Sequence, residues 1–205
     1  MSDTTRRNHA LAETLLDRYG VVIRGAVMAE RTPGGFAAVY PVLRAFEETG
    51  RCRRGYFVEG LGAAQFALPG AVDRLRATER AEAARALVLA ATDPANPYGA
   101  ALPWPDRPGD AASGHKPGRK AGALVILVEG HLVLYVERGG KTLLSWGDND
   151  LQPAVDALAL AVHEGALGKL TVERADGGAI IDSPLAAALE AAGFHPTPRG
   201  LRLRS

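Results

Sequence analysis

Apolar residues recur at helical spacing near the start of the chain. The pattern predicts a helix over 9–19, with Asn8 as its N-cap and Gly20 as a stop signal. A second, short helix is expected over 21–30. The leucines that define the face of the first helix are Leu11, Leu15 and Leu16.

A third helix is predicted over 37–49, after a turn at 32–35. Pro41 is compatible with this helix only in its first turn, because proline lacks a backbone N–H. Gly50 ends the helix. Its apolar face is formed by Phe36, Val39, Leu43 and Phe46.

The period then changes from helical to alternating. Segments 51–59 and 64–68 read as two strands, joined by the small-residue turn Gly-Leu-Gly-Ala. Three helices followed by a two-stranded hairpin is the winged-helix arrangement, in which the hairpin is the wing. A further helix, over 70–78, is expected to lead out of it.

The second half of the chain predicts a mixed, mainly antiparallel module. An apolar strand begins at 86, and the Gly/Pro-rich segment 100–121 has no periodicity, which predicts a long loop. The predicted fold class is therefore α+β: a winged-helix domain over 8–80, then a β-rich module flanked by helices over 81–205. The elements expected after the loop are three strands over 122–146, helices over 151–163 and 184–192, and strands over 169–174 and near 200–204.

Charge is balanced over the whole chain but uneven along it. The 205 residues carry a net charge of +1, which excludes a basic footprint over the whole chain. Residues 1–80 hold 12 Lys/Arg against 9 Asp/Glu, and the remaining residues hold 12 against 14. Any nucleic-acid site is therefore expected to be local, and to lie in the first part.

Composition bears on the cellular location. Cys52 is the one cysteine, so no internal disulfide can form, which fits a reducing compartment. No segment has the length of a signal peptide core or of a membrane span, since the longest apolar run is 123–128. We expect a cytoplasmic protein with no membrane partner.

Arginines concentrate beside the predicted wing. Arginine pairs well with phosphate, and wing residues of DNA-binding winged helices commonly neutralise the backbone. Glu47 and Glu48 near the end of the third helix oppose this interpretation because they would repel phosphate. A wing used only for protein contact is the alternative. The candidate nucleic-acid contacts are Arg44, Arg51, Arg53, Arg54 and Gln65, with Lys116, Arg119 and Lys120 in the long loop.

Several motifs that would indicate other chemistry are incomplete. The Gly-Lys-Thr at 140–142 lacks the first glycine of a phosphate loop, because Tyr135 stands at that position. The five histidines are dispersed, and Leu167 stands where a zinc-protease helix needs its second histidine. We predict no metal site and no cofactor in this chain.

The segment 92–105 carries the parts of a base-handling pocket. Asp93 is a candidate catalytic carboxylate, and Tyr98 and Trp104 are candidates for base stacking. The alternative is structural: Asp93 and Asn96 cap turns while the two aromatic residues pack. The segment is faintly similar to the Asp-Pro-Tyr motif of uracil glycosylases, but three residues intervene before the tyrosine.

Two longer segments carry a more specific resemblance. "RRGYFVEGLGAAQFALPGAVDRLR" and "LAATDPANPYGAALPWP" resemble the C-terminal region of bacterial large helicase-related (Lhr) proteins. The resemblance runs from about residue 8 to the end. It implies a DNA-repair setting, in which an ATP-driven helicase core is followed by tandem winged-helix modules and a β-rich terminal module.

The resemblance also implies a link to base excision. The winged-helix architecture of this region is similar to that of AlkZ-type DNA glycosylases, and glycosylase activity on uracil is associated with it. The AlkZ-type Gln-x-Gln motif is absent here, because Ala63 stands two positions before Gln65. No catalytic residue of that type can therefore be carried over.

Three hypotheses follow from these observations. The first is a non-motor module that binds single-stranded or forked DNA for the rest of a helicase polypeptide, or supports its assembly. The second is a uracil-excising glycosylase module with a base pocket near 93–104. The third is a purely structural domain that forms homo-oligomers through its exposed strand edges.

Overall fold

The computed structural model describes residues 3–62, 64–77, 86–107, 114–147 and 151–204. The chain divides into two compact units. The first, here called the winged-helix unit, is Met1–Arg80 with Ala100–Leu102; the second, the terminal unit, is Ala81–Gly99 with Pro103–Ser205.

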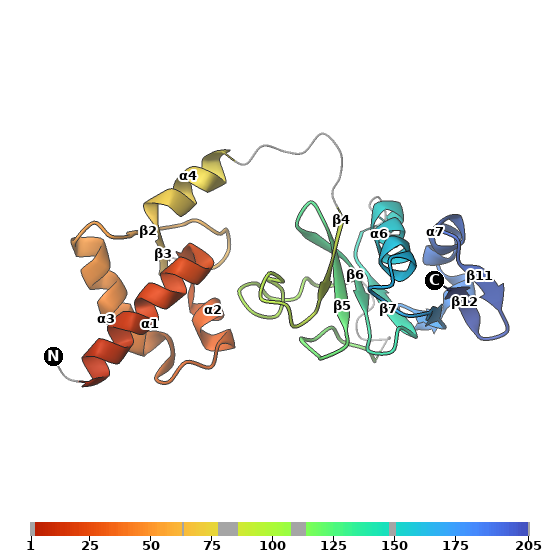
Figure 1. Cartoon of the computed structure of the whole chain (residues 1–205), viewed down its shortest axis with the longest axis horizontal. Coiled ribbons are helices and arrows are strands. Elements are labelled where there is room, and N and C mark those ends of the chain that lie inside the picture. The colour runs from red at the N-terminus through yellow and green to blue at the C-terminus, as the bar shows by residue number, and fades with distance from the viewer. Residues whose placement is uncertain (1–2, 63, 78–85, 108–113, 148–150, 205) are drawn as a thin grey trace. The chain divides into compact units, whose positions relative to one another are not determined.

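The winged-helix unit has three helices packed around one core and a small antiparallel sheet (Figure 1). The sheet has the order β1-β3-β2. Residues from the three helices and from the sheet form the core, among them Leu15, Val27, Leu43 and Phe66, each without exposed surface. The winged-helix prediction is therefore confirmed. Its elements are α1 (Asp3–Tyr19), β1 (Val21–Val22), α2 (Arg24–Ala29), α3 (Gly35–Glu48), β2 (Arg53–Gly55), β3 (Gln65–Ala67) and α4 (Pro69–Ala77).

The predicted helix over 21–30 is only partly correct. Val21 and Val22 form a strand that pairs with Ala67 and Phe66 of β3, and helix begins only at Arg24. β-branched valines lose side-chain freedom in a helix and suit a strand. Hydrogen bonding to β3 of the wing therefore makes Val21 and Val22 extended instead of helical.

Pro41 also departs from expectation, because α3 begins at Gly35 and places it inside the helix. Proline leaves the carbonyl four residues earlier, that of Ala37, without its helical partner. Both residues lie on the exposed side of α3, where water can bond that carbonyl. Burial of Val39, Leu43 and Phe46 on the opposite face keeps the helix continuous.

Gln65 fixes the conformation of the wing loop, although the sequence predicted it as a DNA contact. Its side chain is fully buried. Its Oε1 accepts hydrogen bonds from the Phe57 and Val58 amides at 3.0 and 2.8 Å, and its Nε2 donates to the Val58 and Gly62 carbonyls at 2.8 and 2.7 Å. The short strands need this support because β2 and β3 pair over only three positions. Gln65 is corrected from a nucleic-acid contact to a structural residue, because its amide group is already fully used.

The terminal unit is built on a six-stranded sheet of order β10-β9-β7-β6-β5-β4. All pairings in it are antiparallel except β7 with β9. Helix α6 packs against β4, β5 and β6, and α7 packs against α6 (Figure 1). β5 and β6 are apolar at nearly every position because both faces of the sheet are covered there. The elements of this sheet and its helices are β4 (Ala86–Ala90), β5 (Leu124–Val128), β6 (His131–Val136), β7 (Thr142–Ser145), α6 (Leu151–His163), β9 (Arg174–Ala175), β10 (Gly178–Ala179), the 3₁₀ turn η1 (Ile180–Asp182) and α7 (Leu185–Ala191).

A second, three-stranded sheet lies at the end of the same unit. It consists of β8 (Leu170–Val172), β11 (His195–Thr197) and β12 (Gly200–Leu203), in the order β11-β12-β8. The predicted strand over 169–174 is thus split between two sheets, and β11 was not predicted. Pro196 and the short length of β11 hide its alternation in the sequence.

Cys52 gives a test of the winged-helix core. Its side chain is 1% exposed, and its Sγ lies 3.5 Å from the Leu43 carbonyl oxygen. Burial raises the pKa of the Cys52 thiol, and the nearby Glu47 carboxylate adds to this rise. Since the thiolate is the reactive form, we expect native protein to react with a disulfide reagent at least about a hundredfold more slowly than protein in denaturant. Fast native labelling at neutral pH would contradict this packing.

The Gln65 hydrogen bonds generate a second prediction. Gln65→Ala removes both acceptors and donors, so we expect the Phe57 and Val58 amides to lose protection in hydrogen exchange measured by NMR. A buried group left unsatisfied costs about 1–3 kcal/mol, so the free energy of unfolding should fall by a similar amount. Arg53→Ala is the control, because the exposed Arg53 side chain makes no hydrogen bond or ion pair with the described residues. Unchanged protection of both amides in Gln65→Ala would contradict the assigned role.

Candidate nucleic-acid interface

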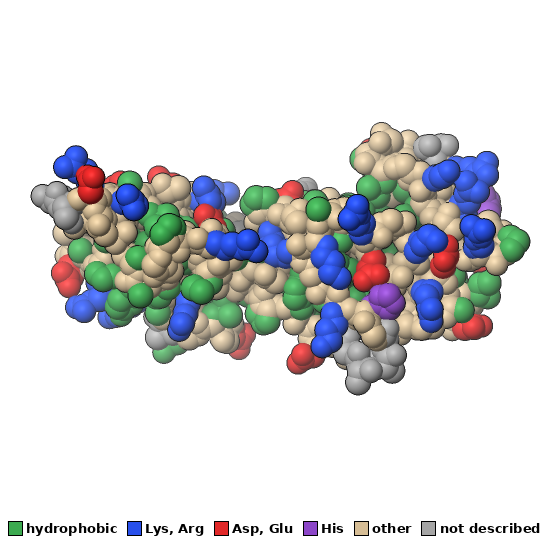
Figure 2. All heavy atoms as spheres, turned by 90° about the horizontal axis from the view of Figure 1, so that it is seen from below, with side chains coloured by type: hydrophobic (Ala, Val, Ile, Leu, Met, Phe, Trp, Pro, Cys, Tyr) green, Lys and Arg blue, Asp and Glu red, His purple; other side chains and the backbone are tan. Residues whose placement is uncertain are grey.

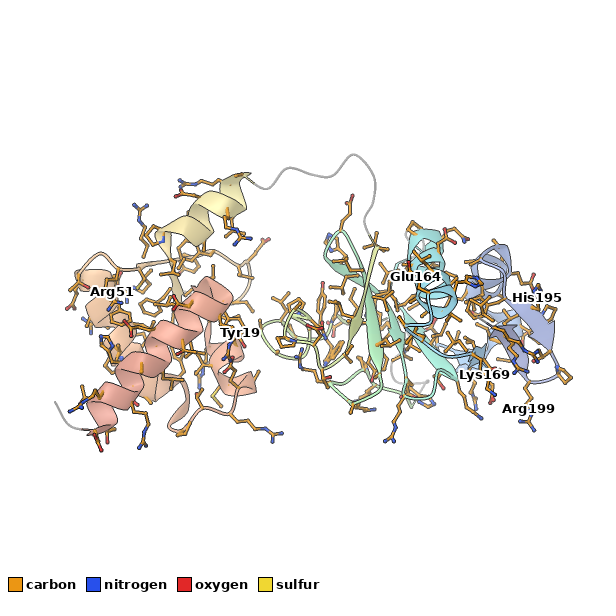
Figure 3. All side chains as sticks on the ribbon, in the orientation of Figure 1. Tyr19, Arg51, Glu164, Lys169, His195 and Arg199 are labelled. Atoms are coloured by element: carbon orange, nitrogen blue, oxygen red, sulfur yellow. The ribbon has the colours of Figure 1, made fainter. Side chains whose placement is uncertain are left out.

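The predicted arginine cluster is largely neutralised within the winged-helix unit. Arg51 donates to Glu13 of α1 at 2.6 Å and lies over the Phe46 ring, 4.2 Å from its centroid (Figure 3). The hydrogen bond from Arg51 lowers the pKa of the Glu13 carboxyl below its ordinary value. Arg51 is therefore held against α1 and is not a free cation on the wing.

Two further candidates also have carboxylate partners. Arg54 Nε lies 3.4 Å from Glu47, and Arg54 Nη1 lies 3.5 Å from the Tyr40 hydroxyl. Arg44 lies 3.5 Å from Glu48, one helical turn along α3. Exposed ion pairs such as these stabilise a protein by only about 0.2–1 kcal/mol, so they do not fix either side chain firmly. They still lower the local positive potential. In the face that Figure 2 shows, acidic side chains lie among the basic ones.

Arg53 differs from its three neighbours. Alternation along β2 places Arg53 opposite Ala67 and Arg54 opposite Phe66, so the two side chains leave the strand on opposite faces. Arg53 is exposed and forms no ion pair within the described part of the chain. The sequence pattern allowed about two wing arginines to face DNA together; the structure leaves Arg53 as the one with an uncompensated charge among Arg44, Arg51, Arg53 and Arg54.

Tyr56 is a candidate that the sequence analysis missed. It follows β2 directly, and 79% of its surface is exposed, the largest exposed fraction among the large apolar residues described. The next two residues, Phe57 and Val58, are held by Gln65 through their amides. The alternating "RRGYF" was the available signal, but alternation alone does not say which aromatic ring turns outward. An exposed ring suits stacking on a base or packing on a sugar.

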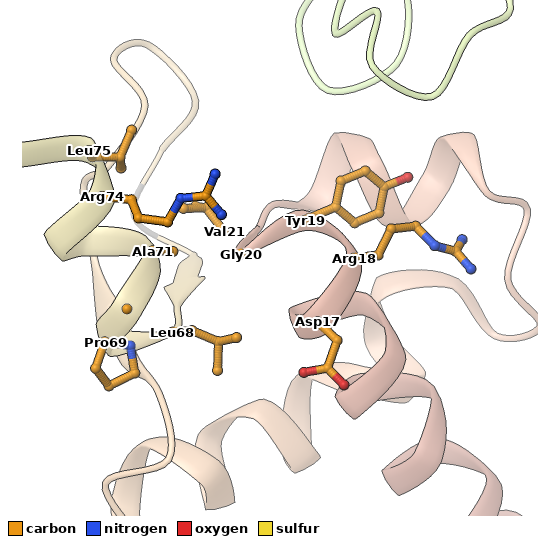
Figure 4. A pocket seen from close by; sticks show the side chains of 11 residues that line it. Asp17, Arg18, Tyr19, Gly20, Val21, Leu68, Pro69, Ala71, Arg74 and Leu75 are labelled. Carbon is orange, nitrogen blue, oxygen red and sulfur yellow. The ribbon is translucent and has the colours of Figure 1, made fainter. Parts of the chain in front are cut away.

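A groove of about 740 Å³ lies elsewhere on the same unit, between the end of α1 and the start of α4 (Figure 4). Its lining mixes one acid, Asp17, with the basic residues Arg18 and Arg74. Arg18 pairs with Glu30, which also accepts a hydrogen bond from Tyr19 at 2.7 Å. This mixed charge does not favour an anionic ligand.

In the terminal unit, the segment predicted as a base pocket is held by its own hydrogen bonds. Asp93 Oδ1 accepts from the Ala95 amide at 2.8 Å, which is an Asx turn. Asn96 is 1% exposed; its Nδ2 donates to the Ala91 carbonyl at 2.9 Å, and its Oδ1 accepts from the Tyr98 amide at 3.1 Å. Both side chains therefore have the structural roles that the alternative interpretation gave them.

The two aromatic candidates pack on each other. Tyr98 is buried and stacks on Trp104 with 6.4 Å between ring centroids and 25° between planes. The Tyr98 hydroxyl donates to the Gly130 carbonyl at 3.0 Å and accepts from the Leu132 amide at 3.3 Å. The prediction that Tyr98 stacks on a base is corrected, because its ring and hydroxyl are already engaged. Trp104 also lies at 81° to the Tyr135 ring, with 5.8 Å between the ring centroids.

Arg119 of the long loop, predicted as a nucleic-acid contact, instead bonds the backbone of the chain. Arg119 donates to four backbone carbonyls at 2.7–3.3 Å, those of Thr92, Asp93, Asn96 and Tyr98. Its guanidinium thus holds the 92–98 segment, and it is not free for phosphate. Lys120 lies 3.9 Å from Glu137, and Lys116 is exposed.

An ion pair between the buried Arg107 and the exposed Asp176 anchors the other end of the 103–107 segment. Arg107 Nη1 donates to Asp176 Oδ1 at 2.6 Å, and the Trp146 indole N–H donates to the Pro105 carbonyl at 3.1 Å. Asp176 also accepts from the Ser145 amide and hydroxyl at 2.9 and 2.6 Å. No local sequence pattern indicates this network, because its members are far apart along the chain.

Two other features bear on ligands and location. Within the described ranges, no group of three or more His, Cys, Asp or Glu side chains is placed to hold a metal ion. None of the described helices is long and apolar enough to cross a membrane.

Comparison with known proteins assigns the first part of the chain to a family. Residues 1–87 match the family model of the large helicase-related protein winged-helix domain. The chain is 54% identical over 217 residues to a protein of Mycolicibacterium smegmatis described as "Lhr helicase/ probable uracil glycosylase", covering 98% of this chain and 14% of that protein. It is 42% identical over 204 residues to the Escherichia coli "Lhr helicase/uracil glycosylase", covering 96% of this chain and 13% of that protein. The chain thus spans about one seventh of the length of these relatives; its first 87 residues belong to the Lhr winged-helix family, and nearly the whole chain is homologous to part of an Lhr protein.

Proposed function

We propose that this chain is a non-motor, DNA-binding module of a larger Lhr-type helicase polypeptide. In this proposal the wing contacts single-stranded DNA or the single-stranded arm of a fork. The observation that carries the proposal is the presence of two exposed side chains on the same hairpin. They are Arg53, whose charge has no carboxylate partner among the described residues, and Tyr56, which is 79% exposed.

The two groups suit the two parts of a nucleotide. A guanidinium binds phosphate through paired N–H donors, and a tyrosine ring stacks on any base because every base has a π-face. Arg53 and Tyr56 are three positions apart on a hairpin whose loop Gln65 fixes. Such a surface binds without strong sequence preference, as an accessory module of a helicase requires. Self-association and a cytoplasmic location stay predictions.

Uracil excision is named for both relatives, but the described residues offer it little support. The carboxylate that we predicted for it, Asp93, bonds its own turn, and the Tyr98 and Trp104 rings stack on each other. Since this chain covers only 14% and 13% of the relatives, their excision activity can reside in other parts of those proteins.

Replacing Arg53 tests the phosphate contact. With a fluorescein-labelled 20-nucleotide single strand, Arg53→Ala should weaken binding in fluorescence anisotropy and lower the salt dependence, the slope of log K against log salt, by about 0.7. Arg51→Ala is the matched control: it removes the same charge two positions away, from a side chain that Glu13 already neutralises. Equal losses in affinity and slope for the two variants would contradict the assignment of Arg53.

Replacing Tyr56 tests the stacking contact separately. Tyr56→Ala should cost about 1–3 kcal/mol of binding free energy, the usual range for one stacked base, while the salt dependence stays unchanged. Tyr56→Phe keeps the ring and should retain most of the affinity. If Tyr56→Ala binds like the unaltered protein, the ring makes no contact with DNA. A loss shared equally by the alanine and phenylalanine variants would assign the effect to the hydroxyl instead.

A further inference from the structure

The small sheet of the terminal unit presents a basic face that none of the DNA contacts above uses. Alternation sends Leu201 and Leu203 of β12 into the core, so Arg202 and Arg204 leave the strand on the other face. His195 of β11 is the register partner of Arg202, which places the two side chains next to each other on that face. Figure 2 shows Lys, Arg and His side chains at the right-hand end of this unit.

A groove of about 650 Å³ opens over this face. Four of its lining residues carry nitrogen donors: His163 at the end of α6, His195, Arg202 and Arg204. Among the described residues that line it, none is Asp or Glu. Lys169 and Arg199 lie at the same end of the unit (Figure 3) and add to the positive potential. Glu164 is the acidic side chain nearest along the chain, adjacent to His163, but it does not line the groove.

Arg202, which lines this groove, has an unsatisfied donor. Its Nε is buried and has no hydrogen-bond partner among the residues that the structure describes. Its backbone lies on the central strand of the sheet, which is paired on both sides, so the start of the side chain is held in place. A buried N–H without a partner costs free energy unless a ligand or water accepts from it, and an anionic oxygen is the strongest acceptor for a guanidinium.

We propose that this small-sheet groove binds a phosphate group, with Arg202 as the central donor and His195, His163 and Arg204 around it. The groove is open and several times the size of one phosphate, so the phosphate can belong to a nucleic-acid backbone or be free. We favour the backbone, since Lys169 and Arg199 continue the positive surface beyond the groove. The proposal does not depend on the wing, because it rests on residues of the other unit.

The test reads the groove directly in the full chain by NMR. Amide signals of 195–204 and the His163 and His195 ring signals are followed in two titrations at constant ionic strength, one with a 12-nucleotide single strand and one with inorganic phosphate. We expect both titrations to shift the groove signals, the oligonucleotide at lower concentration. Shifts with phosphate only would keep the phosphate site but exclude the backbone as its source. No groove shift in either titration would overturn the proposal.

Variants separate this site from the wing. In an Arg53→Ala/Tyr56→Ala background, Arg202→Gln should weaken residual oligonucleotide binding at least about fivefold, and Arg138→Gln, an exposed arginine of the same unit outside the groove, should not. His195→Gln/Arg204→Gln is the second test, because both side chains are exposed and the change spares the partly buried Arg202. Binding that is unaffected by both groove variants would overturn the proposal. If the Arg53 and Tyr56 variants bind DNA normally while the groove signals shift, the proposed wing contact is wrong and the groove proposal is unaffected.

Discussion

The hydrogen bonds of one buried amide determine what the wing can do. Gln65 satisfies two N–H groups and two carbonyls of the loop that joins β2 and β3. A hairpin whose strands pair over three positions is marginal without such support. With it, the segment after β2 is held so that Phe57 is half-buried and Tyr56 stands out into solvent. The outward position of the Tyr56 ring, three residues after Arg53, therefore depends on a side chain that never reaches the surface.

Ion pairs reduce the number of arginines in the same unit that are free to bind phosphate. Glu13, Glu47 and Glu48 each take one arginine, so the local excess of arginines does not become a broad basic surface. Binding by such a surface is expected to be modest, since few phosphates are neutralised at once. A module in a long helicase polypeptide gains affinity from its covalent neighbours, so a modest contact can suffice.

The sequence predicted the architecture well and the sites poorly, for identifiable physical reasons. The spacing of apolar residues along a helix or strand shows which positions are buried, so the winged helix, the central strands and α6 could be recognised from it. Side-chain hydrogen bonds produce no regular spacing in the sequence. Gln65, Arg119 and Tyr98 looked like ligand-binding groups because their residue types bind ligands, yet each bonds backbone atoms of the chain itself. The partners of Gln65 lie within its own hairpin, and those of Tyr98 and Arg119 lie farther away in sequence. The outward turn of Tyr56 and the grouping of His163, His195 and Arg202 depend on the same tertiary pairing, which no local pattern contains.

The most direct measurement is photo-crosslinking of the full chain to a single strand that contains 5-iodouracil, followed by tryptic mass spectrometry. The account predicts that the crosslinked base is attached to Tyr56. It should therefore be found on the tryptic peptide 55–74, which follows Arg54. Tyr56→Ala should abolish that adduct. Efficient crosslinking confined to other peptides would contradict the claim that the wing holds DNA through its exposed tyrosine.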